Sequence, residues 1–169
     1  MAAALIMAVQ ARAAWYDLTY TDGGANVGSG QINVSGGVAV SGFFNVTAGT
    51  AFGSWTLSPG PGSDPSFTWD NNVYPNATPF LDGGGLLFTG TQNGNPAELN
   101  LWGNSGPTDY SFQGNNGGLG TYGNNNSPVS SGTATLTAVP EASTLVAGAL
   151  MLLPFGVSTL RIMRKKVTA

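Results

Sequence analysis

The sequence predicts an all-β protein, an antiparallel β-sandwich or jelly-roll-like domain followed by one C-terminal transmembrane helix. Three observations predict this class. Short alternating apolar and polar runs, separated by glycine and asparagine, fill residues 15–139. No helical period of useful length occurs in that stretch. An uncharged apolar run then covers residues 144–160, and a basic cluster follows it.

The first half of the domain contains four predicted strands. Residues 15–21 alternate and are rich in aromatic side chains and threonine, which favour pleated strands. Three further runs follow at the spacing of an antiparallel meander, at residues 30–34, 38–46 and 52–57. Between the first two of these, Ser35-Gly36-Gly37 predicts a compact hairpin turn of the glycine type.

The second half supplies the remaining strands and one long loop. The predicted strands are residues 66–70, 86–91, 97–102, 110–113 and 132–139, which brings the total to eight or nine. The low-complexity residues 114–131 predict a long loop, and an alternative is a pair of turns around a short strand at 119–122. If the last run is a strand, the domain ends directly before Pro140.

The charge of the domain limits its partners. Residues 15–139 contain six aspartates and Glu98 but no lysine, arginine or histidine, so their net charge is −7. Nucleic acid is excluded as a partner because phosphate binding requires Lys and Arg. An anionic lipid surface is excluded for the same reason. The chain has no cysteine, so the fold depends on sheet hydrogen bonds and apolar burial rather than on disulfides.

The same composition removes most catalytic chemistry. Without histidine, cysteine or lysine in residues 15–139, the domain has no Ser-His-Asp triad, no thiolate and no Schiff-base amine. A carboxylate mechanism is what remains, chiefly glycosidic cleavage. Glu98 is the one glutamate of the domain, and alternation puts it on the face of Asn100 and Trp102, which would suit a sugar platform. We prefer a solvated strand residue, and therefore predict no catalytic residue and a non-enzymatic protein.

Metal binding rests on one group of oxygen ligands. The densest set of such side chains comprises Asp64, Asp70, Asn71, Asn72 and Asp82. Calcium takes six to eight oxygen ligands, but this spacing matches no dedicated calcium loop. Asp and Asn are also common turn residues. We therefore expect no cofactor and keep calcium as the alternative.

The N-terminus has features of a signal peptide. Residues 2–9 are apolar, and the small residues Ala11 and Ala13 occupy positions −3 and −1 of a signal peptidase site. Residues 1–13 are therefore predicted to be removed by signal peptidase. No basic residue precedes Arg12, so we expect this signal peptide to be truncated. The alternative is a hydrophobic N-terminus of a cytoplasmic protein.

The C-terminal apolar run predicts a membrane span. Its 17 residues form a helix of about 26 Å, slightly shorter than a hydrocarbon core of about 30 Å. Lys and Arg resist translocation, so the basic cluster marks the cytoplasmic end. The cluster consists of Arg161, Arg164, Lys165 and Lys166. The acidic domain would then lie on the opposite side of the membrane.

A short motif stands immediately before this span. Its residues are Val139, Pro140, Glu141, Ala142, Ser143 and Thr144. The order of Pro-Glu, apolar helix and basic end resembles the PEP-CTERM sorting domain of Gram-negative bacteria, although Ala142 stands where the motif usually has a second proline. The resemblance covers residues 139–166 and implies processing near Pro140 and Glu141 by an exosortase-type membrane protease. The alternative is a plain C-terminal tail anchor.

Three segments are therefore expected: a signal peptide at 1–13, an exported β-domain at 14–139 and a sorting segment at 140–169. The resemblance implies a precursor in the inner membrane with a periplasmic body, which is then transferred to the cell surface or released outside the cell. Its expected partners are signal peptidase, the exosortase-type protease and an extracellular polysaccharide matrix. The rival function is a carbohydrate-binding module or glycosidase-like domain anchored at the membrane. An ordinary anchored surface protein is the third.

Overall fold

The computed structural model describes residues 13–24, 26–49, 51–64, 66–92, 94–115 and 130–140. These residues form β-strands joined by turns and loops. The strands are β1 (Ala14–Thr21), β2 (Val27–Ser35), β3 (Val38–Ala48), β4 (Gly53–Leu57), β5 (Gly62–Ser63), β6 (Thr68–Trp69), β7 (Leu86–Gln92), β8 (Asn95–Gly103), β9 (Tyr110–Asn115) and β10 (Ser130–Ala138).

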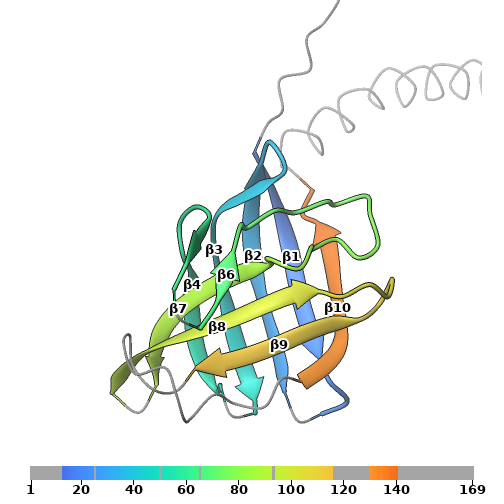
Figure 1. The fold of residues 1–169 in the computed structure, drawn as a ribbon. Coiled ribbons are helices and arrows are strands. Elements are labelled where there is room, and N and C mark those ends of the chain that lie inside the picture. The colour runs from blue at the N-terminus through green and yellow to red at the C-terminus, as the bar shows by residue number, and fades with distance from the viewer. Residues whose placement is uncertain are drawn as a thin grey trace, which may run out of the picture. The chain divides into compact units, whose positions relative to one another are not determined.

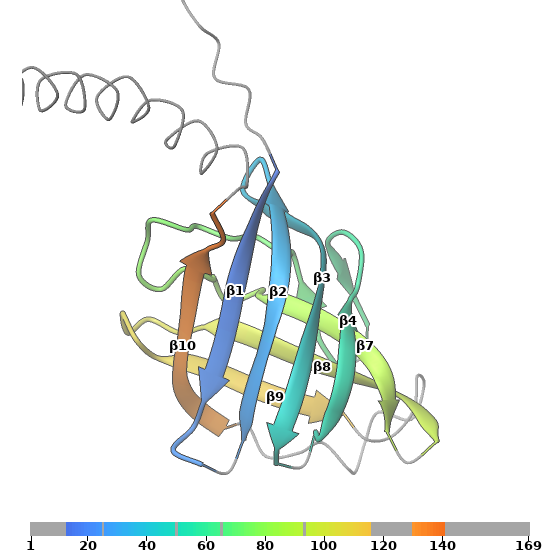
Figure 2. The same cartoon turned by 180° about the vertical axis from the view of Figure 1, so that it is seen from behind.

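Eight of the strands close into an antiparallel barrel (Figures 1 and 2). Their order is β1-β10-β9-β8-β7-β4-β3-β2, and β5 and β6 form a separate two-stranded sheet. Each barrel strand pairs with the next along the chain, with one insertion between β4 and β7. The barrel closes where β10 pairs with β1, from Tyr16 opposite Ala138 to Thr21 opposite Thr133.

The prediction of an all-β antiparallel domain is confirmed, but the sandwich or jelly-roll arrangement is wrong. The expected alternation is the same in a sandwich and in a barrel, because both bury one face of each strand. What distinguishes them here is the β1–β10 ladder, which joins the two ends of the domain. The predicted C-terminal helix lies outside the described residues.

The hairpin between β2 and β3 forms as predicted. Ser35 lies opposite Val38, so Gly36 and Gly37 are the two loop residues. Their φ angles are 60° and 84°, which are left-handed values that favour glycine. Positive φ at both positions is the signature of a type I′ turn, whose twist matches that of the two strands.

The predicted strand at residues 66–70 is wrong for most of its length. Only Thr68 and Trp69 pair, with Ser63 and Gly62. The Asp64 carboxylate accepts the backbone N–H groups of Ser66 and Phe67, both at 2.7 Å, and this holds the chain in a turn. The predicted loop at 114–131 begins and ends within β9 and β10, and its residues 116–129 lie outside the described part of the chain.

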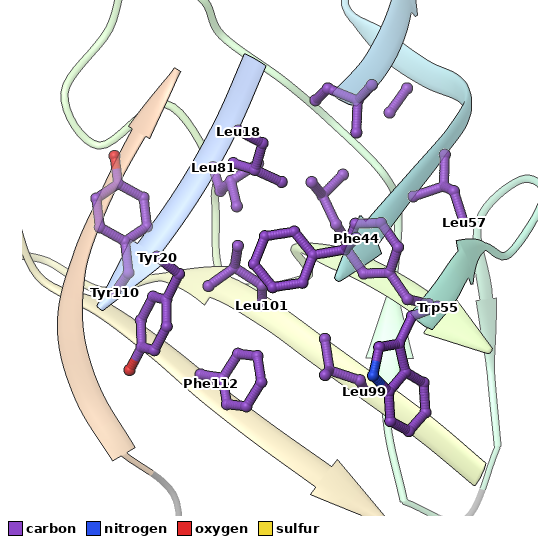
Figure 3. Close-up of a cluster of buried hydrophobic side chains, with 14 of the residues drawn as sticks. Leu18, Tyr20, Phe44, Trp55, Leu57, Leu81, Leu99, Leu101, Tyr110 and Phe112 are labelled. Atoms are coloured by element: carbon purple, nitrogen blue, oxygen red, sulfur yellow. The ribbon is translucent and has the colours of Figure 1, made fainter. Parts of the chain in front are cut away.

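The barrel interior is a packed core, as expected for eight strands. Figure 3 shows side chains from several strands pointing toward one another. The Tyr20 and Phe112 rings stack with centroids 4.9 Å apart, and the Phe44 and Phe88 centroids are 5.6 Å apart. Buried Trp55 donates its indole N–H to the Ala51 carbonyl at 2.9 Å, so this polar group is satisfied.

The chain divides into two compact units, residues 1–138 and 139–169. The barrel belongs to the first unit, and its last strand ends at the boundary. Of the second unit, the structure describes Val139 and Pro140.

Candidate functional site

The insertion between β4 and β7, residues 58–85, covers part of the barrel wall, and we call it the overlay loop. Figure 1 shows it as the green segment that carries β6 and crosses the barrel before returning to β7. Its first residue donates its backbone N–H to the Leu87 carbonyl at 2.8 Å. Near its end, the Gly103 N–H donates to the Asp82 carbonyl at 2.9 Å. The overlay loop is thus hydrogen-bonded to β7 and to β8.

Asn71 fixes the overlay loop from within. Its amide Nδ2 donates to the Ser58 carbonyl at 2.8 Å and to the Gly60 carbonyl at 3.2 Å. Its Oδ1 accepts the Leu87 backbone N–H at 3.3 Å. The residue is fully buried and has a φ of 57°, a left-handed conformation that asparagine tolerates better than most residues. Asn71 therefore links the start of the overlay loop to β7 through its side-chain amide.

Glu98 is buried, which corrects the expectation of a solvated strand residue. Alternation does place it on the outer face of β8 with Asn100, because Leu99 and Leu101 fill the core. The overlay loop covers that face, however, and both Glu98 and Asn100 are only 4% exposed. Leu87, opposite Asn100 on β7, is likewise buried outside the core cluster. An outer face is solvated only where no further layer covers it.

Glu98 shares this space with a second carboxyl group, that of Asp64 on the overlay loop. The pKa of Glu98 is raised to about 7, first by burial and second by the neighbouring Asp64. The residues 13–160 contain no cation that could offset the charges of Glu98 and Asp64. Protonation of Glu98 removes a buried negative charge beside Asp64, so the folded state favours the neutral form of Glu98.

A second carboxyl pair lies elsewhere in the overlay loop. Burial raises the pKa of Asp70, and the neighbouring Asp82 raises it further. Burial also raises the pKa of Asp82, but hydrogen bonds from the Gly85 and Gly84 N–H groups, Asn72 and Tyr74 outweigh it, so this pKa lies below its usual value. The hydrogen bonds satisfy both oxygens of Asp82.

The five predicted calcium ligands therefore do not converge. Asp70, Asn72 and Asp82 lie together, while Asp64 lies beside Glu98 and Asn71 is used by the loop. Among the described residues, no group of three or more carboxylates, histidines or cysteines could hold a metal ion.

A pocket of about 250 Å³ lies between the overlay loop and the outer face of β8 and β9. Its lining consists of Ser66, Phe67, Thr68, Gly83, Asn100, Trp102 and Gln113. Asn100 and Gln113 are cross-strand partners, so their amides lie side by side on this face. The prediction that Asn100 and Trp102 share a face with Glu98 agrees with this arrangement, although Glu98 itself does not line the pocket.

Gly85 allows the overlay loop to approach β8 this closely. It has a φ of 68°, and a Cβ atom there would lie 2.6 Å from Trp102 Cβ. A larger residue would therefore both strain the backbone and push the loop away from the pocket.

A broader groove of about 500 Å³ lies on the outer face of β1, β2 and β3, outside the overlay loop. Phe43 is 42% exposed there and is flanked by polar side chains, including Asp17 and Gln31. Gln31 donates to the Asp17 carboxylate at 2.9 Å. This groove therefore has the solvated outer face that a single-layered barrel wall is expected to have.

Most of the predicted sorting and processing residues lie outside the described part of the chain. These are Ala11, Glu141, Ala142, Ser143, Thr144, Arg161, Arg164, Lys165 and Lys166. Ala13 and Pro140 are exposed, and Val139 is half-buried. Within the described ranges, no helix is long and apolar enough to cross a membrane.

Sequence reasoning missed Asn71 as an anchor and the Asp64–Glu98 pair. An Asn after Asp70 signals a turn, but nothing local indicates which distant carbonyls it will reach. Likewise, Asp64 and Glu98 are separated by two elements and meet only because the overlay loop folds back.

No family model, curated protein or solved structure matches this chain.

Proposed function

We propose that this chain is an exported, non-enzymatic surface or extracellular-matrix protein, delivered by its C-terminal signal. One observation carries the proposal: Pro140-Glu141, the uncharged run at 144–160 and the basic cluster from Arg161 to Lys166 occur in that order. This order resembles the PEP-CTERM sorting domain, whose members are substrates of an exosortase-type protease. A helix with basic residues after it has its cytoplasmic end there.

The limits of the barrel support the two proposed cleavages. The barrel begins with β1 at Ala14, directly after the proposed signal peptidase site at Ala13. It ends with β10 at Ala138, before Pro140. Cleavage at both sites would therefore release a body that keeps every strand of the barrel.

The proposed route follows from these cleavages. Signal peptidase acts on the N-terminal segment, and the precursor stays in the inner membrane with its body in the periplasm. The exosortase-type protease then acts near Pro140 and Glu141. The body reaches the cell surface or the extracellular polysaccharide.

The burial of Glu98 supports a non-enzymatic body over a glycosidase. Glycosidases hold two carboxyl groups on either side of the scissile bond, with room between them for the sugar or for water. Glu98 is only 4% exposed and does not line the pocket described above. Its carboxyl group is therefore not placed to flank a glycosidic bond.

The test is the intact mass of the protein from the surface fraction of cells that carry the matching protease. We expect an N-terminus at Ala14 and a C-terminus between Pro140 and Ser143. Replacing Pro140 and Glu141 by Ala should leave the precursor in the inner membrane. The control, Thr135→Ala with Thr137→Ala, changes two exposed positions just upstream and should be processed normally. Surface-bound protein that keeps residues 150–161 in full amount would refute the proposal.

A further inference from the structure

The pocket beneath the overlay loop has a chemical character that export and sorting do not explain. Three of its residues, Ser66, Phe67 and Thr68, come from the tip of the loop, and Gly83 comes from its end. The floor comes from β8 and β9 through Asn100, Trp102 and Gln113. Two separate parts of the chain thus build a small concave site whose lining is amide, hydroxyl and aromatic.

A buried polar atom without a partner borders this pocket. Asn100 is 4% exposed, and its Oδ1 accepts no hydrogen bond, although its Nδ2 donates to the Gly84 carbonyl at 3.4 Å. Buried acceptors without a hydrogen bond are rare in native proteins because leaving one unpaired is unfavourable, so a missing partner is expected.

We propose that this pocket binds one unit of a neutral sugar, with Asn100 Oδ1 accepting a sugar hydroxyl and Trp102 packing against the ring. The site is distinct from the sorting segment, and the proposal stands whether or not the chain is exported.

Three properties of the site select this ligand class. Residues 13–160 contain no lysine, arginine or histidine, so nothing can pair with a phosphate or carboxylate ligand. The lining combines amides and hydroxyls, which both donate and accept hydrogen bonds, as sugar hydroxyls do. The volume of about 250 Å³ falls below the range of about 300–1,000 Å³ of sites for drug-sized molecules, so one ring fits and a longer chain must extend outward.

Asn100 Oδ1 has almost no accessible surface, so a ligand reaches it only when the loop tip moves outward. Within the tip, the Ser66 and Phe67 N–H groups donate to Asp64 Oδ1, and these local bonds are kept when the tip moves as a unit. Thr68 lines the pocket and is exposed, so its hydroxyl is accessible to a ligand at the rim.

The experiment uses the full chain, purified in a detergent that lacks a sugar headgroup. Saturation-transfer NMR is run against a panel of neutral mono- and oligosaccharides, with a uronic acid for comparison. We expect saturable binding of at least one neutral sugar with a dissociation constant on the order of 1 mM, since one small polar ligand makes few contacts. The same sugar should raise the melting temperature of the barrel, because it binds only the folded state.

Two variants locate the site. Trp102→Ala should weaken binding at least about tenfold, because the aromatic surface is lost. Thr68→Val keeps the shape of an exposed residue and should weaken binding about threefold to tenfold by removing one hydroxyl. The matched control is Phe43→Ala, which removes an exposed aromatic ring from the groove on β1–β3 and should leave binding unchanged. Near-UV circular dichroism checks that each variant is folded.

The outcomes separate the alternatives. Absence of saturable binding and of thermal stabilisation by every neutral sugar overturns the proposal. A loss of binding in Phe43→Ala, with Thr68→Val unaffected, also overturns it and assigns binding to the other groove. Tighter binding of the uronic acid contradicts the neutral ligand class. Hydrolysis of the sugar that disappears in Glu98→Gln overturns both this proposal and the non-enzymatic function, whereas a failure of sorting alone leaves this proposal standing.

Discussion

Two halves of the same barrel wall differ in what lies outside them. On the half under the overlay loop, five consecutive residues of β8 from Ala97 to Leu101 are buried, on both faces of the strand. On the other half, β1 and β10 alternate in exposure, with Leu18 buried between the exposed Asp17 and Thr19. The strands have the same geometry, so the difference comes from the added layer and not from the barrel.

The added layer changes the chemistry of the polar groups beneath it. Asp17, on the exposed half, takes a hydrogen bond from Gln31 in contact with solvent. Glu98, on the covered half, has its pKa raised to about 7 by burial first and by Asp64 second. Among the described residues, the carboxyl groups with shifted pKa values therefore lie outside the barrel core, either beneath the overlay loop or within it. Four predictions test that contrast.

The largest effect is expected at Asn71, which holds the layer in place. Asn71→Ala removes hydrogen bonds to the Ser58 and Gly60 carbonyls and from the Leu87 N–H, and it leaves alanine at a φ of 57°. At about 1 kcal/mol for each bond and about 1 for the strain, the variant should lose about 4 kcal/mol in urea unfolding. Asn71→Gly relieves the strain and should lose about 1 kcal/mol less. Equal losses in the two variants would show that the left-handed conformation contributes nothing.

The second prediction concerns the loss of stability when an apolar side chain on the outer face of the barrel is truncated. It compares two such residues. Leu87 is 1% exposed beneath the overlay loop, and Val40 is exposed on the other half. Leu87→Ala should cost about 3 kcal/mol because it leaves a cavity between loop and wall. Val40→Ala should stay within about 0.5 kcal/mol. Similar costs, measured by urea unfolding, would mean that the overlay loop does not pack as a second layer.

A pH effect is expected on the covered half. The pKa of Glu98 is about 7 in the folded state against an ordinary value of 4.5, so folding favours its protonated form. Its contribution is complete below pH 4.5 and is lost as the pH rises through about 7. The full shift corresponds to about 3 kcal/mol, and after allowance for solvent screening we expect a loss of about 1–2 kcal/mol between pH 5 and pH 8.

Glu98→Gln isolates this effect, because glutamine does not ionise and has nearly the same shape as glutamate. The variant should be more stable than the wild type at pH 8. Its stability should no longer fall between pH 5 and pH 8 as that of the wild type does. Melting temperatures across that range provide the measurement. If the melting temperatures of the wild type and the variant change equally with pH, Glu98 is not the cause of the pH dependence.

The smallest effect is expected on the exposed half. Thr19 and Thr135 face each other across β1 and β10, and their hydroxyl oxygens are 2.6 Å apart. Thr135→Ala removes this solvated contact and should cost less than about 0.5 kcal/mol by thermal melting. A loss of stability close to that of Leu87→Ala would mean that the β1–β10 pairing, which closes the barrel, depends on this pair.

Local patterns in the sequence were sufficient for the barrel strands and for the tightest turn. The Thr-rich alternation of β1 and β10 and the Gly36-Gly37 turn involve only neighbouring residues, so the sequence predicts them. The strand expected at 66–70 failed because Asp64, two residues before its start, captures backbone N–H groups that a strand would have used. Of the site, the shared face of Glu98, Asn100 and Trp102 could be predicted, but its burial could not.

The sequence by itself determined the all-β class, the acidic and cation-free character of the barrel, and the order of the residues that suggest sorting. These depend on composition and on short-range periodicity. Only the tertiary structure decided that β10 closes on β1, that the overlay loop covers β8, and that Asp64 meets Glu98. The physical reason is that alternation fixes which side of a strand a residue takes, whereas burial and pKa depend on what distant part of the chain lies against that side.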